Sequence, residues 1–462
     1  MQTSYLLMLL IVIAVIAYAM GYGRSFAVAK PLGGIRHLHS LPFYYAMQSF
    51  LWALLPAALI LGAWVAFDGA VIERMVIESL PASAMPSDPS QNSLVMSQIQ
   101  NVANGALDPQ YMDQAIVDAA DRFKHWQAQS QLVVTALSIT LAILGAGFAW
   151  ARISPQLRAR EQVEKALRRI FAVCASLAIL TTLGILLSVL FEALRFFHKI
   201  PLTEFLFGLQ WSPQTAIRAD QVGSSGAFGM IPLFAGTLLI SFIAMVVAVP
   251  VGLMSAIYLS EYAPRKVRGT VKPMLEVLAG VPTVVYGFFA ALTVAPAIRD
   301  LAASVGLNAS SESALAAGLV MGIMIIPFVS SLADDVINAV PQSMRDGSLG
   351  LGATQSETIA KVIFPAALPG IMGGVLLAVS RAIGETMIVV MAAGLAANLT
   401  ANPLDAVTTV TVQIVTLLVG DQEFDSAKTL AAFALGLMLF IVTLCLNVVA
   451  LHIVRKYREQ YD

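Results

Sequence analysis

Residues 346–371 read DGSLGLGATQSETIAKVIFPAALPGI and lie between two long apolar runs. Pro341, just before this stretch, suits the first turn of a helix, and Gly350 and Gly352 are expected to end that helix. A second helical pattern, TQSETIAKVI, follows and is expected to end at Pro365. The pattern therefore predicts a compact projection of two short helices, suited to a groove on another protein. Taken alone, the segment is equally compatible with a simple connecting loop.

Nine apolar runs of the chain are long enough to cross a bilayer, which takes about 20 residues of helix. Hydrophobic residues make up 58% of the 462 and charged residues only 12%, against about 25% in soluble domains. A net charge of −1 argues against a general nucleic-acid binder. The sequence therefore predicts an all-α polytopic membrane protein. The runs are 4–23, 43–66, 130–150, 170–194, 231–259, 274–296, 314–333, 370–393 and 428–453.

The distribution of Lys and Arg predicts the orientation in the membrane. With the N-terminus outside, the segments on the cytoplasmic side carry 18 basic residues and the external segments carry 8. Cytoplasmic loops are the ones enriched in Lys and Arg. We therefore expect a multi-pass protein with an external N-terminus, a cytoplasmic C-terminus, the loop 334–369 inside and the segment 67–129 outside.

The external segment 67–129 begins with a polar stretch, PASAMPSDPSQNS, that is typical of a linker. Asp108 and Pro109 are a plausible N-cap and first residue of a helix. We expect a short helix on the membrane-facing surface, with docking of an external protein as the alternative. One face of this helix would carry Met112, Ile116, Ala119 and Phe123.

The stretch 346–371 resembles the EAA loop of ABC-importer permeases, in which an acidic residue and two alanines are followed by a glycine. The loop of this chain departs from that pattern in having Asp for Glu and Gly-Ser for Ala-Ala. The resemblance implies that the loop contacts an ATPase. The matching positions are Asp346, Gly347, Ser348 and Gly352, with Ile363 and Pro365 in the closing region.

Three further stretches are similar to the permease subunits of phosphate ABC importers and occur in that family's order. They are SGAFGMIPLFAGTLLIS (225–241), LAGVPTVVYGFFA (278–290) and SRAIGETM (380–387). The resemblance covers roughly residues 200–455 and leaves the first three spans outside it. It implies a protein of the bacterial inner membrane and a translocation pathway shared with a second permease subunit.

By this resemblance, residues 170–462 form a six-helix permease core, and residues 1–169 form an extension with three extra transmembrane helices. The implied partners are a second permease subunit, a cytoplasmic ATPase dimer, an external phosphate-binding protein and membrane lipid. The chain has no G-x-x-x-x-G-K-[ST] phosphate loop, so we expect ATP to be used by the partner ATPase, with no cofactor, metal or enzymatic activity in this chain. Cys174 and Cys445 lie in apolar runs and predict neither a disulfide nor a metal site.

Arg381 and Glu385 interrupt an apolar run, where insertion scales assign each charge a cost of about 2.5–3.5 kcal/mol. Their spacing of four residues predicts that they share one helical face. Because the guanidinium fork matches an oxyanion and stays charged, we interpret Arg381 as part of an anion pathway, with Glu385 orienting it. A static salt bridge is the alternative. Ser380, Thr283 and Tyr286 are candidates for the same pathway.

The leading hypothesis is a permease subunit of an ATP-driven phosphate importer. The same architecture carrying sulfate, molybdate or phosphonate is an alternative, and so is a secondary transporter that uses Arg381 and Glu385 as a proton relay. An EAA-like loop argues against the last, because an ion-driven carrier has no ATPase to dock. The sequence leaves open the anion, the role of the first three spans and any signalling through a partner kinase.

Overall fold

The computed structural model describes residues 3–81, 92–108, 112–214, 226–419 and 425–457. Within these ranges, nine helices are long and apolar enough to cross a membrane, which confirms the predicted all-α polytopic fold. They are Thr3–Leu32, Pro42–Glu78, Gln114–Arg152, Ala159–Lys199, Ile231–Tyr262, Thr283–Ser304, Ala314–Ala339, Gln355–Ile383 and Ala427–His452.

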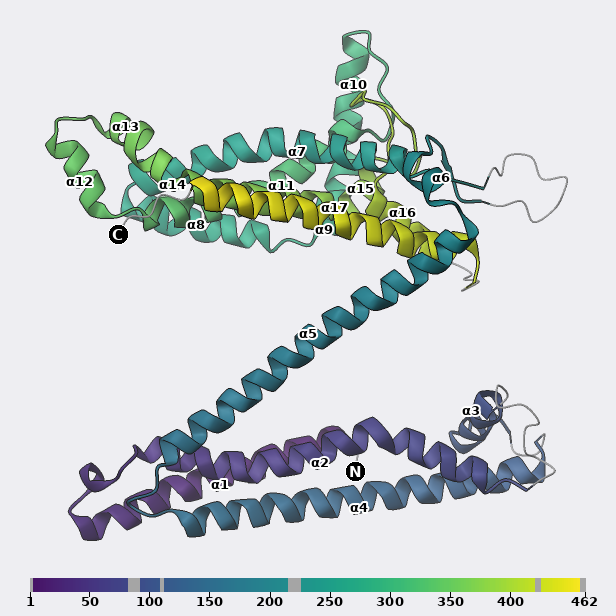
Figure 1. The fold of residues 1–462 in the computed structure, drawn as a ribbon, viewed down its shortest axis with the longest axis vertical. Coiled ribbons are helices and arrows are strands. Elements are labelled where there is room, and N and C mark those ends of the chain that lie inside the picture. Colours follow the sequence, from purple (N-terminus) through teal and green to yellow (C-terminus); the bar gives the residue numbers. More distant parts are fainter. Residues whose placement is uncertain (1–2, 82–91, 109–111, 215–225, 420–424, 458–462) are drawn as a thin grey trace. The chain divides into compact units, whose positions relative to one another are not determined.

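Residues 1–180 form the first of two compact units. Its long helices α1 (Thr3–Ala29), α2 (Pro42–Glu78) and α4 (Gln114–Arg152) pack against one another (Figure 1). A Cβ added to Gly145 of α4 would lie 2.0 Å from a carbonyl oxygen of α2. Small residues at such crossings let helix backbones approach closely. The fourth long helix, α5 (Ala159–Lys199), begins in this unit.

The segment 67–129 differs from its prediction. The structure adds α3 (Asn92–Ala103), and α4 begins at Gln114, where the backbone N–H of Ala115 donates to the Asp113 side chain at 3.4 Å. Asp108 is therefore not the N-cap; Pro109 and most of the predicted linker lie outside the described residues. The helix is not a separate surface element, because it continues into the membrane span. The predicted face does form, since Ala119 is buried and Met112, Ile116 and Phe123 pack around it with residues of α2 and α3.

Residues 181–462 form the second unit, which contains a two-stranded antiparallel sheet with Trp211 opposite Phe228. Its elements, after the end of α5, are α6 (Leu202–Phe207), β1 (Trp211–Ser212), β2 (Ala227–Phe228), α7 (Ile231–Ile257), α8 (Arg265–Ala279), α9 (Thr283–Phe289), α10 (Ala295–Ser304), α11 (Ala314–Ala339), α12 (Gln342–Gly350), α13 (Gln355–Thr358), α14 (Phe364–Ile383), α15 (Met387–Ala392), α16 (Val410–Leu418) and α17 (Ala427–Tyr457).

Helix α11 lies at the centre of the second unit and packs on α7, α8 and α14 (Figure 1). A Cβ at Gly318 would lie 2.7 Å from the Ile243 side chain, and one at Gly322 would lie 2.9 Å from the carbonyl oxygen of Ala244. These two glycines let α7 and α11 run in close contact along their length. Most of α11 is consequently buried within the chain.

The predicted span 274–296 is wrong in its boundaries. Its beginning belongs to α8, which ends at Ala279, and a new helix starts after Pro282. That helix, α9, continues through a π-helical turn at Ala290–Val294 into α10. Apolar composition alone does not separate these pieces, because the break lies inside a continuous apolar run.

The predicted span 370–393 is wrong in the same way, since the spanning helix covers Gln355–Ile383. The expected helix end at Pro365 is also wrong, because α13 continues through a π-helical turn at Ile359–Ile363 into α14. Pro365 lies in the first turn of α14. A π-helical turn alters the local backbone hydrogen bonding. The helix therefore continues past Pro365, although proline has no backbone N–H to donate.

Candidate functional site

The EAA-like segment forms a helix, a turn and a second helix, as predicted. Pro341 is the N-cap of α12, which ends at Gly350. Gly352 has a φ of +89°, a left-handed conformation that favours glycine. The following helix begins with a capping box, in which Thr354 and Glu357 accept each other's backbone N–H at 3.3 and 3.0 Å. On the other side of the turn, the backbone N–H groups of Leu351 and Gly352 donate to carbonyls of α12 at 3.1 and 2.9 Å, so local hydrogen bonds hold both sides of the turn.

The residues matched to the EAA pattern differ in exposure. Asp346 is exposed and accepts a hydrogen bond from Gln342 at 3.0 Å, and Gly347 has open space around it. The Ser348 hydroxyl lies 2.9 Å from that of Thr358 and joins the two helices of the projection. Ile363 is buried and Pro365 is exposed. The exposed face of α12 is therefore free to contact a partner, while Ser348 and the buried Ile363 hold the shape of the projection.

An ion pair that the sequence did not reveal anchors this projection. The Arg345 guanidinium contacts the Glu261 carboxylate and donates to the carbonyl of Ile337 at 2.7 Å. Gln355 donates to the backbone carbonyl of Glu261 at 2.7 Å. Only 13% of the Arg345 side chain and 9% of the Glu261 side chain are exposed. Glu261 lies just after α7, so the pair ties the projection to a helix of the membrane core.

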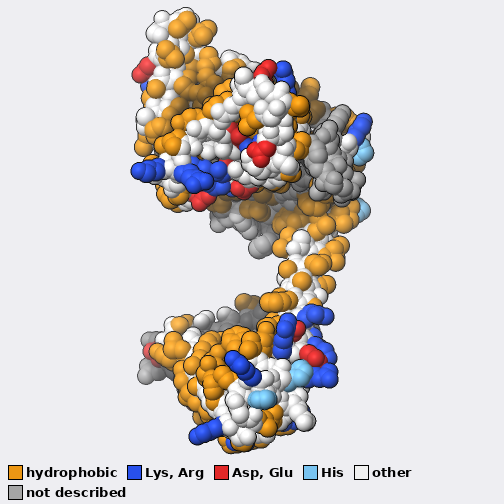
Figure 2. Space-filling view, turned by 90° about the vertical axis from the view of Figure 1, so that its left-hand side faces the viewer, with side chains coloured by type: hydrophobic (Ala, Val, Ile, Leu, Met, Phe, Trp, Pro, Cys, Tyr) orange, Lys and Arg blue, Asp and Glu red, His pale blue; other side chains and the backbone are white. Residues whose placement is uncertain are grey.

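A second group of charges connects α8 to α11 at the same end of the unit. The buried Asp334 carboxylate accepts from Arg268 at 3.1 Å and from Lys272 at 2.7 Å, and Lys272 also lies 3.2 Å from Asp335. The hydrogen bond to Asp334 raises the pKa of Lys272 above its usual value. Figure 2 views this end of the unit, where basic and acidic side chains gather. The surface next to the projection is therefore charged and held by ion pairs.

The structure separates Arg381 from Glu385, and the predicted pairing is wrong. Helix α14 ends at Ile383 and is capped at Gly384. The Glu385 carboxylate instead accepts from the backbone N–H groups of Met387 and Ile388 at 3.1 and 3.5 Å, at the start of α15. Since the helix stops between them, the two side chains do not share a helical face.

Arg381 itself lies in the last turn of α14 with its guanidinium 5.7 Å from the centre of the Phe328 ring. Its side chain is exposed in the single chain, and among the described residues no carboxylate pairs with it. The adjacent Ser380 donates to the Asn447 side chain of α17 at 3.0 Å. The arginine is thus held beside an aromatic ring and left open to another molecule.

The other two candidates lie on α9. Thr283 is its first residue, and the Tyr286 hydroxyl donates to the carbonyl of Leu278 at 3.1 Å. A Cβ at Gly287 would lie 2.7 Å from the sulfur of Met391, so α9 and α15 are in close contact. The structure therefore joins α9 to the segment that follows Arg381. Within the described residues, no hydrogen bond connects Thr283 or Tyr286 to Arg381.

Two protein-family models match this chain, one over its N-terminal part and the other over its C-terminal part. A family described as a phosphate ATP-binding cassette transporter matches residues 7–181. A second, described as the binding-protein-dependent transport system inner membrane component, matches residues 248–459. The second match contains the projection and the break after α14.

Two relatives that are more than 30% identical to this chain are named as permeases of ABC or phosphate transport systems. A probable ABC transporter permease protein YqgH of Bacillus subtilis is 31% identical over 60% of this chain and 86% of its own length. A phosphate transport system permease protein PstC 1 of Mycobacterium tuberculosis is 32% identical over 54% of this chain and 81% of its own length. Among solved structures, a bacterial alginate ABC transporter chain aligns with 64% of this chain and all of its own, at 15% identity and a TM-score of 0.44. The chain belongs to the PstC family of binding-protein-dependent ABC transporter permeases.

Proposed function

We propose that the chain is a membrane-spanning permease subunit of an ATP-driven phosphate importer and forms half of the translocation pathway. The observation that carries the cargo assignment is the similarity to permeases named for phosphate transport over most of their length. Arg381, exposed and without a carboxylate partner among the described residues, fits an oxyanion by charge and by geometry. A proton relay between Arg381 and Glu385 lacks support, because the helix break separates them.

In this proposal Arg381, Ser380, Thr283 and Tyr286 line the pathway, and Glu385 acts by stabilising the break between α14 and α15. Residues 170–462 form the permease core, and residues 1–169 form an extension. The partners are a PstA-like second permease, a PstB-like ATPase dimer that hydrolyses ATP, and a PstS-like external phosphate-binding protein. The chain is then a transport subunit and not itself an enzyme.

Uptake of labelled phosphate by cells that depend on this chain tests the cargo. We expect uptake that requires ATP and resists competition by sulfate, molybdate and phosphonate. Stronger inhibition by one of those anions than by unlabelled phosphate would assign the transporter to that anion instead. Uptake that persists after removal of the partner ATPase would exclude an ATP-driven importer.

Membrane orientation gives a second prediction. Asn104 and Ser356 are both exposed, and the excess of basic residues places Asn104 outside and Ser356 in the cytoplasm. With Cys174 and Cys445 replaced, Asn104→Cys should react with a membrane-impermeant thiol reagent in intact cells, and Ser356→Cys should react only after lysis. The reverse pattern would invert the proposed topology.

The turn at Gly352 gives a third prediction. A left-handed conformation costs residues with a Cβ roughly 1–2 kcal/mol, so Gly352→Val should distort the projection and lower ATP-driven uptake about tenfold. Gly350→Ala is the matched control, because Gly350 is exposed in open space without a positive φ. Uptake is normalised to the amount of chain in the membrane. Equal uptake by the two variants would argue against a coupling role for this turn.

A further inference from the structure

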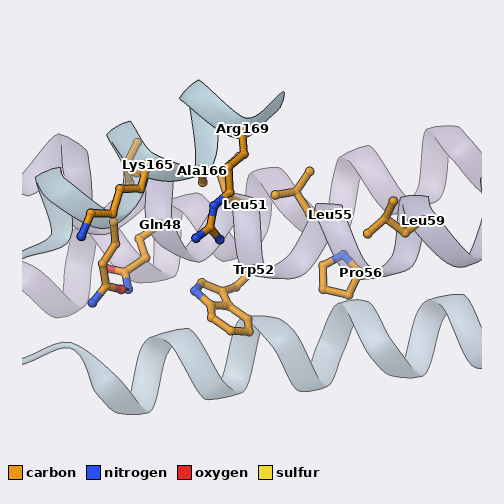
Figure 3. Close-up of a pocket in the computed structure, with 11 residues that line it drawn as sticks. Gln48, Leu51, Trp52, Leu55, Pro56, Leu59, Lys165, Ala166 and Arg169 are labelled. Carbon is orange, nitrogen blue, oxygen red and sulfur yellow. Dashed lines mark hydrogen bonds between the residues drawn. The ribbon is translucent and has the colours of Figure 1, made fainter. Parts of the chain in front are cut away.

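A groove in the first unit combines an apolar wall with two basic side chains. It has a volume of about 420 Å³ and lies between α2 and the beginning of α5 (Figure 3). Leu51, Leu55 and Leu59 follow one another along α2 at intervals of four residues and form its apolar wall. This volume lies within the roughly 300–1,000 Å³ typical of small-molecule sites.

The basic end of the groove is formed by Lys165 and Arg169 of α5, one helical turn apart. In Figure 3 the Arg169 guanidinium is directed toward α2, close to Leu51. Arg158, just before α5, and Arg160 within it pair with Glu161 and Glu164 of α5. Within the described part of the chain no carboxylate pairs with Lys165 or Arg169, so two positive charges at one end of an apolar groove are left for an anion.

A third feature is a buried amide oxygen. The side chain of Gln48 is buried and lines the groove beside Lys165. Its nitrogen donates to Gln162 at 2.7 Å, which holds α5 on α2. Its oxygen has no hydrogen-bond partner among the described residues. Since a buried acceptor without a donor is destabilising, the groove offers a place for a hydroxyl group next to the two charges.

We propose that this groove binds one anionic phospholipid that carries a glycerol head group, such as phosphatidylglycerol. Its phosphate lies between Lys165 and Arg169, a head-group hydroxyl donates to Gln48, and an acyl chain lies along Leu51, Leu55 and Leu59. The excess of basic residues places this end of α2 and α5 at the cytoplasmic surface, where basic pockets between helices bind anionic head groups. The proposal concerns the first unit and is independent of the transported anion.

Native mass spectrometry of the purified full-length chain tests the proposal. Detergent-solubilised protein is incubated with phosphatidylglycerol or with phosphatidylcholine of identical acyl chains, and retained lipid is counted. We expect one phosphatidylglycerol retained in preference to phosphatidylcholine. Two basic residues near the surface, at about 1 kcal/mol each, predict an affinity loss of about 30-fold for Lys165→Gln combined with Arg169→Gln.

Four further variants test whether the lost binding is specific to the two charges. Arg168→Gln, next to the groove but not lining it, should bind lipid like the wild type. Ala166→Phe should fill the groove and reduce retention of both lipids, while Lys165→Arg with Arg169→Lys should retain phosphatidylglycerol. The wild type should prefer phosphatidylglycerol over phosphatidate, whose head group has no alcohol hydroxyl, and for Gln48→Leu this preference should disappear.

Equal retention of both lipids by the wild type would overturn the proposal. So would unchanged phosphatidylglycerol binding by the Lys165/Arg169 double variant, or loss of binding by Arg168→Gln to the same degree. If the assembled transporter retains no lipid that depends on Lys165 and Arg169, a protein segment occupies the groove and the lipid assignment is wrong.

Discussion

Replacement of Arg345 by methionine is expected to lower ATP-driven uptake at least about a hundredfold while leaving the chain in the membrane. The substitution removes one member of a largely buried ion pair and leaves the Glu261 carboxylate, only 9% exposed, without its arginine. Removal of one partner from a buried pair typically costs about 3–5 kcal/mol, and 3 kcal/mol corresponds to more than a hundredfold change in an equilibrium. This loss of free energy weakens the contact that anchors α12 to the end of α7.

The same result is expected from Glu261→Gln, since Arg345 then loses its carboxylate. Arg74→Met is the matched control, because Arg74 and Glu78 form an ion pair that is 81% and 64% exposed, and such pairs contribute about 0–1 kcal/mol. Uptake and ATPase co-purification are measured together, each normalised to the amount of chain in the membrane. Full uptake by Arg345→Met, or an equal loss in Arg74→Met, would show that the buried pair does not couple the projection to the core.

The fold could largely be predicted from hydropathy, because a membrane span requires a long apolar helix whatever its partners are. The nine predicted runs each overlap a candidate span. The projection after Pro341 could also be predicted, since proline and glycine act on the local backbone. Gly352 does adopt the positive φ that such a turn requires.

The boundaries inside apolar runs could not be predicted. A glycine within a helix costs only about 1 kcal/mol, so Gly384 in the sequence did not indicate that α14 would stop there. The four-residue spacing of Arg381 and Glu385 predicts one face only if the helix continues. The structure instead uses the Glu385 carboxylate to cap the backbone of α15, a role that depends on the break itself.

Contacts between distant segments also could not be predicted from the sequence. Arg345 and Glu261 are 84 residues apart, and nothing in the local pattern around either residue indicates the other. Asp334 likewise accepts hydrogen bonds from Arg268 and Lys272, which lie on a helix more than 60 residues earlier in the chain. A charged residue near the end of a span is usually an interfacial one, so only the folded chain distinguishes these pairs from ordinary surface charges.

Arg381→Gln is expected to lower phosphate uptake by roughly 10- to 150-fold, because hydrogen bonds to a charged group contribute about 1.5–3 kcal/mol. Arg381→Lys should also transport poorly, since a single ammonium cannot make the paired contact of a guanidinium with an oxyanion. Glu385→Gln should keep most of the uptake, because the amide oxygen can still accept the N–H groups of Met387 and Ile388. Uptake is measured in cells and normalised to the amount of assembled complex.

The double variant Arg381→Gln with Glu385→Gln separates a pathway residue from a structural partner. If Arg381 and Glu385 formed a salt bridge, removal of both charges would restore the uptake that either single change loses. The structure joins the Glu385 carboxylate to the backbone of α15 and places the Arg381 guanidinium over Phe328, so the two effects should simply add. The double variant should therefore transport no better than Arg381→Gln alone. Recovery to near the wild-type rate would mean that the charges compensate each other, and Arg381 would then not serve as the anion's ligand.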